Sequence, residues 1–251
     1  NNATLVVVGD VNPVAVLALA RRHFSPVPRR DVARSVSAQE PPQTAERRAR
    51  ISAPAEVPYL ILGYHVPVLA SDDKSYEPYA LDVLSAILGG GNSSRLAREL
   101  VREQKLAASA DAGYSPIARS PGMLMLDGSP ATGHTIDELE RALRAQVARL
   151  REQPVTAEEL NRVKAQVVAG NIYARDSVMG QAMQIGQLAV SGLDWRLQDT
   201  FVRRLKAVTA REVQEVAQKY LVDSNLTVTI LDPQPGGKGR PRPAREAGHV
   251  R

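Results

Sequence analysis

Apolar positions recur along the chain in two patterns, one typical of strands and one typical of helices. Short apolar or β-branched runs predict strands at residues 5–8, 57–66, 106–114, 122–129 and 226–231. Apolar residues spaced three and four positions apart predict helices at residues 13–24, 75–88, 94–103, 136–150, 157–168, 179–190 and 195–208 and from 210 onward. Helices and strands are segregated along the chain. The pattern therefore favours an α+β fold, a two-layer sandwich with a mainly antiparallel sheet and its helices packed on one face.

Three helices of the second half begin with a threonine that is followed three residues later by a glutamate. The pairs are Thr135/Glu138, Thr156/Glu159 and Thr209/Glu212. In a capping box the threonine oxygen accepts a hydrogen bond from the glutamate's backbone amide, and the glutamate carboxylate accepts one from the threonine's. We therefore expect a capping box at each of these helix starts.

The chain divides into four segments. Residues 1–28 are predicted to be the closing strand and helix of a preceding homologous domain, because their apolar run ends in an aspartate as the strand at 226–231 does. Residues 29–50 have no apolar period and are rich in Arg, Ser, Gln and Pro, so they are expected to form an exposed linker. The main α+β domain is expected at 51–232, followed by a basic, flexible tail at 233–251.

Composition excludes several classes of protein. The 251 residues include no cysteine, so a disulfide framework, a thiolate nucleophile and a cysteine metal site are all ruled out. No apolar run approaches the roughly 20 residues that a membrane-spanning helix needs. We therefore expect no membrane span.

The net charge of +5 raises the question of a nucleic-acid partner. The excess positive charge lies in the predicted linker and tail, whereas residues 51–232 carry 19 Lys and Arg against 22 Asp and Glu. Only 4% of the residues are aromatic, too few for a base-stacking platform. No nucleic-acid partner is expected.

Residues with catalytic or metal-binding chemistry are scattered. None of the four histidines (His23, His65, His134 and His249) has a second histidine four residues away or stands in the inverted zincin order, so no metal ligand is predicted. Residues 89–96 place three glycines before a helix start, as phosphate cradles do, but lack the Gly-Lys-Ser/Thr ending of a P-loop. A loop followed by a helix cap is favoured there. Taken alone, the residues predict a noncatalytic or incomplete module.

Four stretches, by their order and spacing, resemble the C-terminal half of a pitrilysin/insulinase-type zinc peptidase. They are Leu5-Val-Val-Val-Gly-Asp-Val followed by Asn12-Pro13, Gly90-Gly-Asn-Ser-Ser-Arg-Leu, Leu100-Val-Arg-Glu-Gln, and Pro154-Val-Thr-Ala-Glu-Glu-Leu. The resemblance covers residues 1–233. Within this family the chain is similar to the bacterial two-subunit members and to mitochondrial processing peptidase. It implies two homologous halves that enclose a chamber.

In such peptidases zinc is held by an inverted His-x-x-Glu-His motif and a later Glu in the N-terminal half, which we expect to lie outside this chain. The resemblance thus implies that this chain carries no cofactor and is inactive alone, and that it forms chamber wall and a peptide-binding surface. Its expected partners are the N-terminal half, a homologous partner subunit and a peptide substrate. A bacterial envelope location, in the periplasm, is also implied.

The resemblance further implies substrate-binding residues, in which an Arg in a Val-Arg-Glu context pairs with a Tyr after Leu-Ala. Arg102 matches the first element, but Ala108 stands where the tyrosine is expected and the spacing is one residue short. Asn92, Ser93 and Arg95 join Arg102 as candidate substrate-binding residues. The departure fits the C-terminal half of a zinc-bearing subunit whose partner supplies the Arg/Tyr pair. It also fits a noncatalytic homologue that acts as an assembly or partner subunit, and upstream sequence would separate the two.

Overall fold

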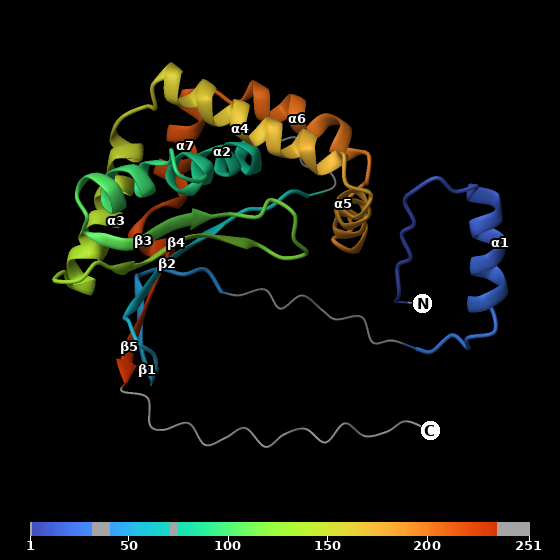
Figure 1. The fold of residues 1–251 in the computed structure, drawn as a ribbon, viewed down its shortest axis with the longest axis horizontal. Coiled ribbons are helices and arrows are strands. Elements are labelled where there is room, and N and C mark those ends of the chain that lie inside the picture. The colour runs from blue at the N-terminus through green and yellow to red at the C-terminus, as the bar shows by residue number, and fades with distance from the viewer. Residues whose placement is uncertain (1, 32–40, 71–74, 235–251) are drawn as a thin grey trace.

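A single five-stranded sheet organises the main part of the chain in a computed structural model that describes residues 2–31, 41–70 and 75–234 (Figure 1). Its strands are β1 (Arg47–Pro54), β2 (Tyr59–Val66), β3 (Ala107–Gly113), β4 (Gly122–Pro130) and β5 (Leu226–Gln234). The spatial order is β1-β5-β2-β4-β3. β1 runs parallel to β5, and every other pair is antiparallel. The predicted mainly antiparallel sheet is confirmed.

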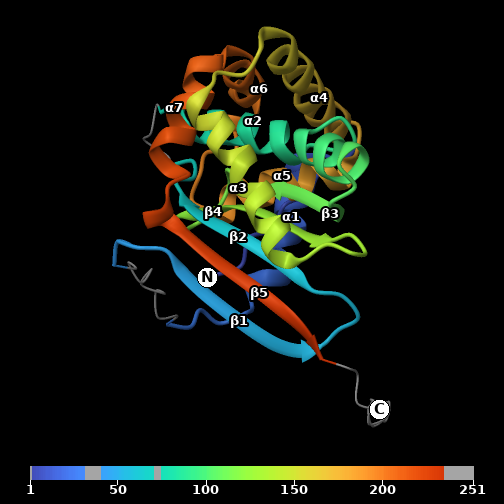
Figure 2. The same ribbon diagram turned by 90° about the vertical axis from the view of Figure 1, so that its left-hand side faces the viewer.

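The helices of the main domain lie over one face of this sheet (Figures 1 and 2). The α-helices with the main contacts to the strands are α2 (Glu77–Gly89), α3 (Ile136–Glu152) and α7 (Ala210–Tyr220). α4 (Ala157–Arg175) and α6 (Leu197–Ala207) pack on α2, and α5 (Val178–Val190) packs on α4. The predicted α+β sandwich with its helices on one face is confirmed.

Strand alternation decides which side chains reach the core. In β2, Leu60, Leu62 and Tyr64 are buried beneath the helices, whereas Ile61 points to the other face and is partly exposed. On that other face Met123, Met125 and Ile51 remain 36%, 44% and 52% exposed. Within the described residues this face therefore has no covering layer.

The predicted helix starts are confirmed at two of three capping boxes. Thr135 and Glu138 exchange both hydrogen bonds, as do Thr209 and Glu212. At the start of α4, the Thr156 hydroxyl accepts a hydrogen bond from the Glu159 backbone amide. The Glu159 carboxylate, however, binds Arg95 instead of the Thr156 backbone amide. The expected third capping box is therefore only half formed, because a tertiary partner captures the carboxylate.

The helix predicted at residues 94–103 is present, and all of it from the third residue onward is a π-helix, η1 (Leu96–Glu103). Its wider turn is seen where the Gln104 amide donates to the Glu99 carbonyl, five residues back, at 2.9 Å. Lys105 then adopts a left-handed φ of 52°, and the Leu106 amide returns to the Leu100 carbonyl at 3.0 Å. This ending turns the chain sharply into β3. A short 3₁₀ helix, η2 (Asp223–Asn225), likewise leads into β5.

The N-terminal segment differs from expectation in part. α1 (Pro13–Phe24) is capped by Asn12 as predicted, but residues 5–8 form no strand and α1 buries no side chain. A strand requires a hydrogen-bonding neighbour, and none of the described strands pairs with residues 5–8. The predicted apolar face of α1, which includes Leu17 and Phe24, is therefore exposed (51% and 60%).

The predicted linker and tail also need adjustment at their inner ends. β1 begins at Arg47, inside the segment 29–50, because residues 47–50 find a parallel partner in β5 that their sequence does not reveal. β5 extends to Gln234, so the first two residues of segment 233–251 belong to the sheet. The rest of the predicted tail, with His249, and residues 32–40 of the predicted linker lie outside the described residues.

Candidate functional site

The predicted substrate-binding segment begins where α2 ends against the sheet. Gly89 lies so close to Ala112 of β3 that a Cβ atom would overlap the strand's backbone. Gly91 has a φ of 98°, which suits glycine alone among common residues. The glycine run thus serves to stop α2 and turn the chain across the end of β3, as the loop interpretation expected.

Asn92 and Ser93 follow in the turn between α2 and η1. Asn92 is exposed, whereas Ser93 is half-buried and its Oγ accepts a hydrogen bond of 3.1 Å from Gln166 on α4. Ser94 is buried, and its Oγ lies 3.4 Å from the Ala97 amide. The turn is therefore fixed to α4 while Asn92 stays open to solvent.

Arg95 is buried beside α4, where it forms an ion pair with Glu159. Arg95 Nε and Nη2 lie 2.9 Å and 2.7 Å from the two Glu159 carboxylate oxygens. These hydrogen bonds lower the pKa of Glu159 even though burial works to raise it. Because both donors are engaged, Arg95 would have to leave Glu159 before binding a substrate through them.

Arg102 lies near the end of η1 and is exposed. It forms no hydrogen bond or ion pair with another of the described residues. Arg95 lines a polar hollow together with Arg98, Arg149 and Arg162. The other three candidates, Asn92, Ser93 and Arg102, do not line it. The structure thus brings the four candidate residues onto one segment without gathering them in one pocket, and their substrate-binding role stays a prediction.

Glu99, between the candidate arginines, is held by three donors from η1 and α3. Its carboxylate accepts from Arg98 at 3.0 Å, Gln146 at 2.7 Å and Arg149 at 2.6 Å. Burial acts to raise the pKa of Glu99, but these hydrogen bonds outweigh it and the pKa lies below its usual range. Glu99 thus ties η1, the helix that carries Arg102, to α3.

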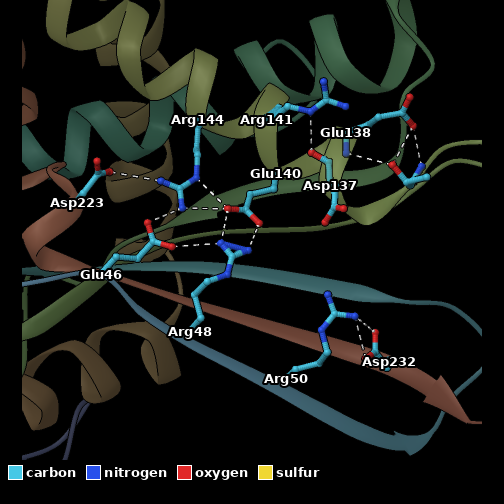
Figure 3. Close-up of polar contacts among 11 residues, drawn as sticks. Glu46, Arg48, Arg50, Asp137, Glu138, Glu140, Arg141, Arg144, Asp223 and Asp232 are labelled. Carbon is cyan, nitrogen blue, oxygen red and sulfur yellow. Dashed lines mark hydrogen bonds and ion pairs between the residues drawn. The ribbon is translucent and has the colours of Figure 1, made fainter.

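A second ion network, which the sequence did not reveal, fixes the edge strand β1 to α3 (Figure 3). Glu140, with only 7% of its surface exposed, accepts from Arg48 of β1 at 2.9 Å and from Arg144 at 2.9 Å. Arg144 also reaches Glu46 at 2.8 Å and Asp223 at 3.3 Å. The network joins residues 46 and 223, far apart in sequence, at the start of the paired strands β1 and β5.

No group of three or more His, Asp and Glu side chains lies in position to hold a metal ion in the part of the chain that the structure describes. No helix among the described residues is long and apolar enough to cross a membrane. His134 lies 3.4 Å from Glu138 at the start of α3, where it forms part of the helix cap region.

Comparison with known proteins decides the family. Residues 1–167 match the family model described as "Peptidase M16 inactive domain". The chain belongs to the peptidase M16 inactive-domain family. It is 28% identical over 239 residues to the zinc protease PqqE of Helicobacter pylori, covering 92% of this chain and 52% of PqqE. It is also 24% identical over 190 residues to the mitochondrial-processing peptidase subunit alpha of Solanum tuberosum, covering 71% and 37% of the two chains.

The M16 inactive domain also matches solved structures over most of its length. The crystal structure of a protease from Helicobacter pylori aligns with a TM-score of 0.79 and 25% identity, covering 90% of this chain and 54% of that one. The chain therefore spans about half the length of PqqE and of this solved relative. The resemblance inferred from sequence is confirmed, and the chain is a noncatalytic domain of a zinc-protease-like protein.

Proposed function

We propose that this M16 inactive domain is the noncatalytic C-terminal portion of a zinc metalloendopeptidase and forms chamber wall and a surface for extended peptide. The observation that carries the proposal is the position of β3. It is an edge strand of the sheet, and it follows directly from the π-helix that presents Arg102. An unpaired strand edge offers backbone donors and acceptors to any extended peptide, whatever its sequence.

The two edges of the sheet differ in a way that favours β3. β1 carries Arg47, Arg48 and Arg50, and charged side chains on an edge discourage strand addition. β3 carries one charged residue, the exposed Asp111, among small residues, and Ala108 and Ser109 are also exposed. A peptide can therefore approach the β3 edge closely, and Arg102 would add a charge-assisted contact to a peptide carbonyl or carboxylate.

The same proposal assigns zinc to an N-terminal half outside this chain. The partners are that half and a homologous subunit, the substrate is a peptide, and the location is the bacterial envelope. Residues 1–28 would then belong to the preceding homologous domain, with 29–50 as linker. The exposed apolar residues of α1, which include Leu17 and Phe24, support this assignment because a helix of that character needs a partner surface. Cell fractionation tests the location.

Reconstitution of the full subunit with its partner tests the peptide surface. We expect Ala108→Lys to raise KM for peptide hydrolysis more than it changes kcat, since a lysine on the edge opposes strand addition.

Arg102→Ala should change kcat/KM little if the partner supplies the Arg/Tyr pair. A loss of 100-fold or more, about 2.7 kcal/mol, would assign that role to Arg102. Arg47→Ala, on the opposite edge, removes the same charge as a control.

The second candidate function is that of an assembly or partner subunit without a peptidase role. It is favoured by Ala108, which stands where the related peptidases place a tyrosine. Metal analysis separates the candidates. The 251-residue chain alone should bind no stoichiometric zinc and hydrolyse no peptide. A full-length protein with one zinc and an upstream His-x-x-Glu-His motif supports the peptidase, and a zinc-free one without the motif supports the assembly role.

A further inference from the structure

A hollow of about 200 Å³ opens in the helical layer, and no residue of β3 or η1 lines it. Its walls come from α2, α4, α5, α6 and the loop between β3 and β4. The apolar part of the lining includes Ile117, Leu188, Leu197 and Phe201. This volume lies below the roughly 300–1,000 Å³ of common drug-sized ligand pockets, so only a small ligand would fit.

Asp82 of α2 is the one acidic residue that lines this hollow. The side chain is only partly exposed and, within the described residues, has no hydrogen-bond or ion-pair partner. Burial raises its pKa to about 6, so the group is ionised at pH 7.5. A carboxylate that has lost water without gaining a donor is costly to the fold. A ligand that brings positive charge and N–H donors would remove that cost.

The neighbouring side chains complete the chemistry. The side-chain amide nitrogen of Asn171 donates a hydrogen bond to the Val167 carbonyl at 2.9 Å. Its Oδ1 atom can therefore still accept a hydrogen bond. The Gln184 amide lines the same hollow. Phe201 also lines the hollow, and aromatic rings attract organic cations. Leu188 and Leu197 suit an alkyl chain.

We propose that this hollow is a binding site for a small organic cation, a primary ammonium on a short alkyl chain, with Asp82 as its counter-ion. The ammonium would donate to the Asp82 carboxylate and to the Asn171 amide oxygen, while the alkyl chain packs against Leu188, Leu197 and Phe201. The site is separate from the peptide surface, so it does not depend on the peptidase proposal.

Titration of the 251-residue chain with n-butylammonium at pH 7.5, followed by amide NMR shifts, tests the proposal. We expect saturable shifts in α2, α5 and α6, and binding at least tenfold weaker for the neutral analogue 1-butanol. Asp82→Asn should weaken n-butylammonium binding at least tenfold. Asp199→Asn, an exposed carboxylate on α6, removes the same charge and should leave binding unchanged.

Three results would overturn the site. One is the absence of saturable binding by the wild-type chain. Another is equal binding of n-butylammonium and 1-butanol, which would mean an apolar hollow without charge recognition. The third is an equal loss in Asp82→Asn and Asp199→Asn, which would mean general attraction by net charge. Far-ultraviolet circular dichroism of both variants confirms that each is folded.

Discussion

Arg95 and Glu159 form a two-pronged ion pair that joins the start of η1 to the first turn of α4, with side chains only 9% and 12% exposed. The two residues are 64 positions apart in sequence. Guanidinium and carboxylate match in geometry, so each donor meets its own acceptor. The pair fixes the turn that carries Asn92 and Ser93.

We expect Arg95→Met to lower the free energy of unfolding by about 3–5 kcal/mol, because the Glu159 carboxylate is left buried and unpaired. Urea unfolding at pH 7 measures the change. Arg102→Met is the matched control and should change stability by less than about 0.5 kcal/mol, since Arg102 is exposed. Equal effects of the two substitutions would contradict a structural role for the pair.

The pair should also have a signature in acid. Because the pKa of Glu159 is lowered in the folded protein, the carboxylate holds its proton less tightly there than in the unfolded chain. Its stabilisation is therefore complete above the unfolded pKa, about 4.3, and is lost as the pH falls through the lower folded value. We expect the stability difference between wild type and Arg95→Met to shrink below pH 4, and a constant difference down to pH 2 would disprove the linkage.

The Glu140 network should hold β1 in place. Glu140→Gln leaves Arg48 and Arg144 without their shared carboxylate, and we expect a loss of about 2–3 kcal/mol together with faster amide hydrogen exchange in β1. Asp232→Asn breaks the more exposed ion pair that Asp232 forms with Arg50, which lies on β1 like Arg48. This substitution should lower the free energy of unfolding by less than about 1 kcal/mol. If both variants behave alike, the buried network is not what secures the strand.

Close packing at the end of α2 gives a further prediction. Gly89→Ala places a Cβ against the backbone of β3 and should destabilise the fold by about 1–3 kcal/mol. Gly170→Ala, within α4 and facing open space, should instead stabilise it by about 0.5–1 kcal/mol through helix propensity. Thermal unfolding measures both changes, and we expect a lower Tm for Gly89→Ala and a higher Tm for Gly170→Ala.

The Asp82 carboxylate should destabilise the folded chain at neutral pH. Its pKa is raised from 3.8 to about 6, so the folded state binds the proton more tightly and stability falls as the pH rises between these values. We therefore expect Asp82→Asn to increase the free energy of unfolding by up to about 3 kcal/mol at pH 7.5 and to change it little at pH 4. Urea unfolding at both pH values measures this, and a pH-independent difference would argue against an ionised buried carboxylate.

The sequence by itself determined the elements and their class. Apolar periodicity predicted the described α-helices, the helix that contains η1 and four of the five described strands, because burial of one face leaves a regular imprint on the chain. Local hydrogen bonding also predicted the caps of Asn12, Thr135 and Thr209, since both partners lie within one turn. The family could be recognised for the same reason, as its motifs are short and ordered along the chain.

Only the tertiary structure decided which distant groups meet. Arg47 to Arg50 look like linker until β5 supplies a parallel neighbour, and residues 5–8 look like a strand although no described strand pairs with them. Glu159 fits a capping box until Arg95 captures its carboxylate. Asp82 lies three residues after Tyr79, on the apolar side of its helix, but that spacing does not reveal a hollow built by other helices. Pairing, ion-pair choice and cavities depend on contacts between segments far apart in sequence, and local patterns carry no record of them.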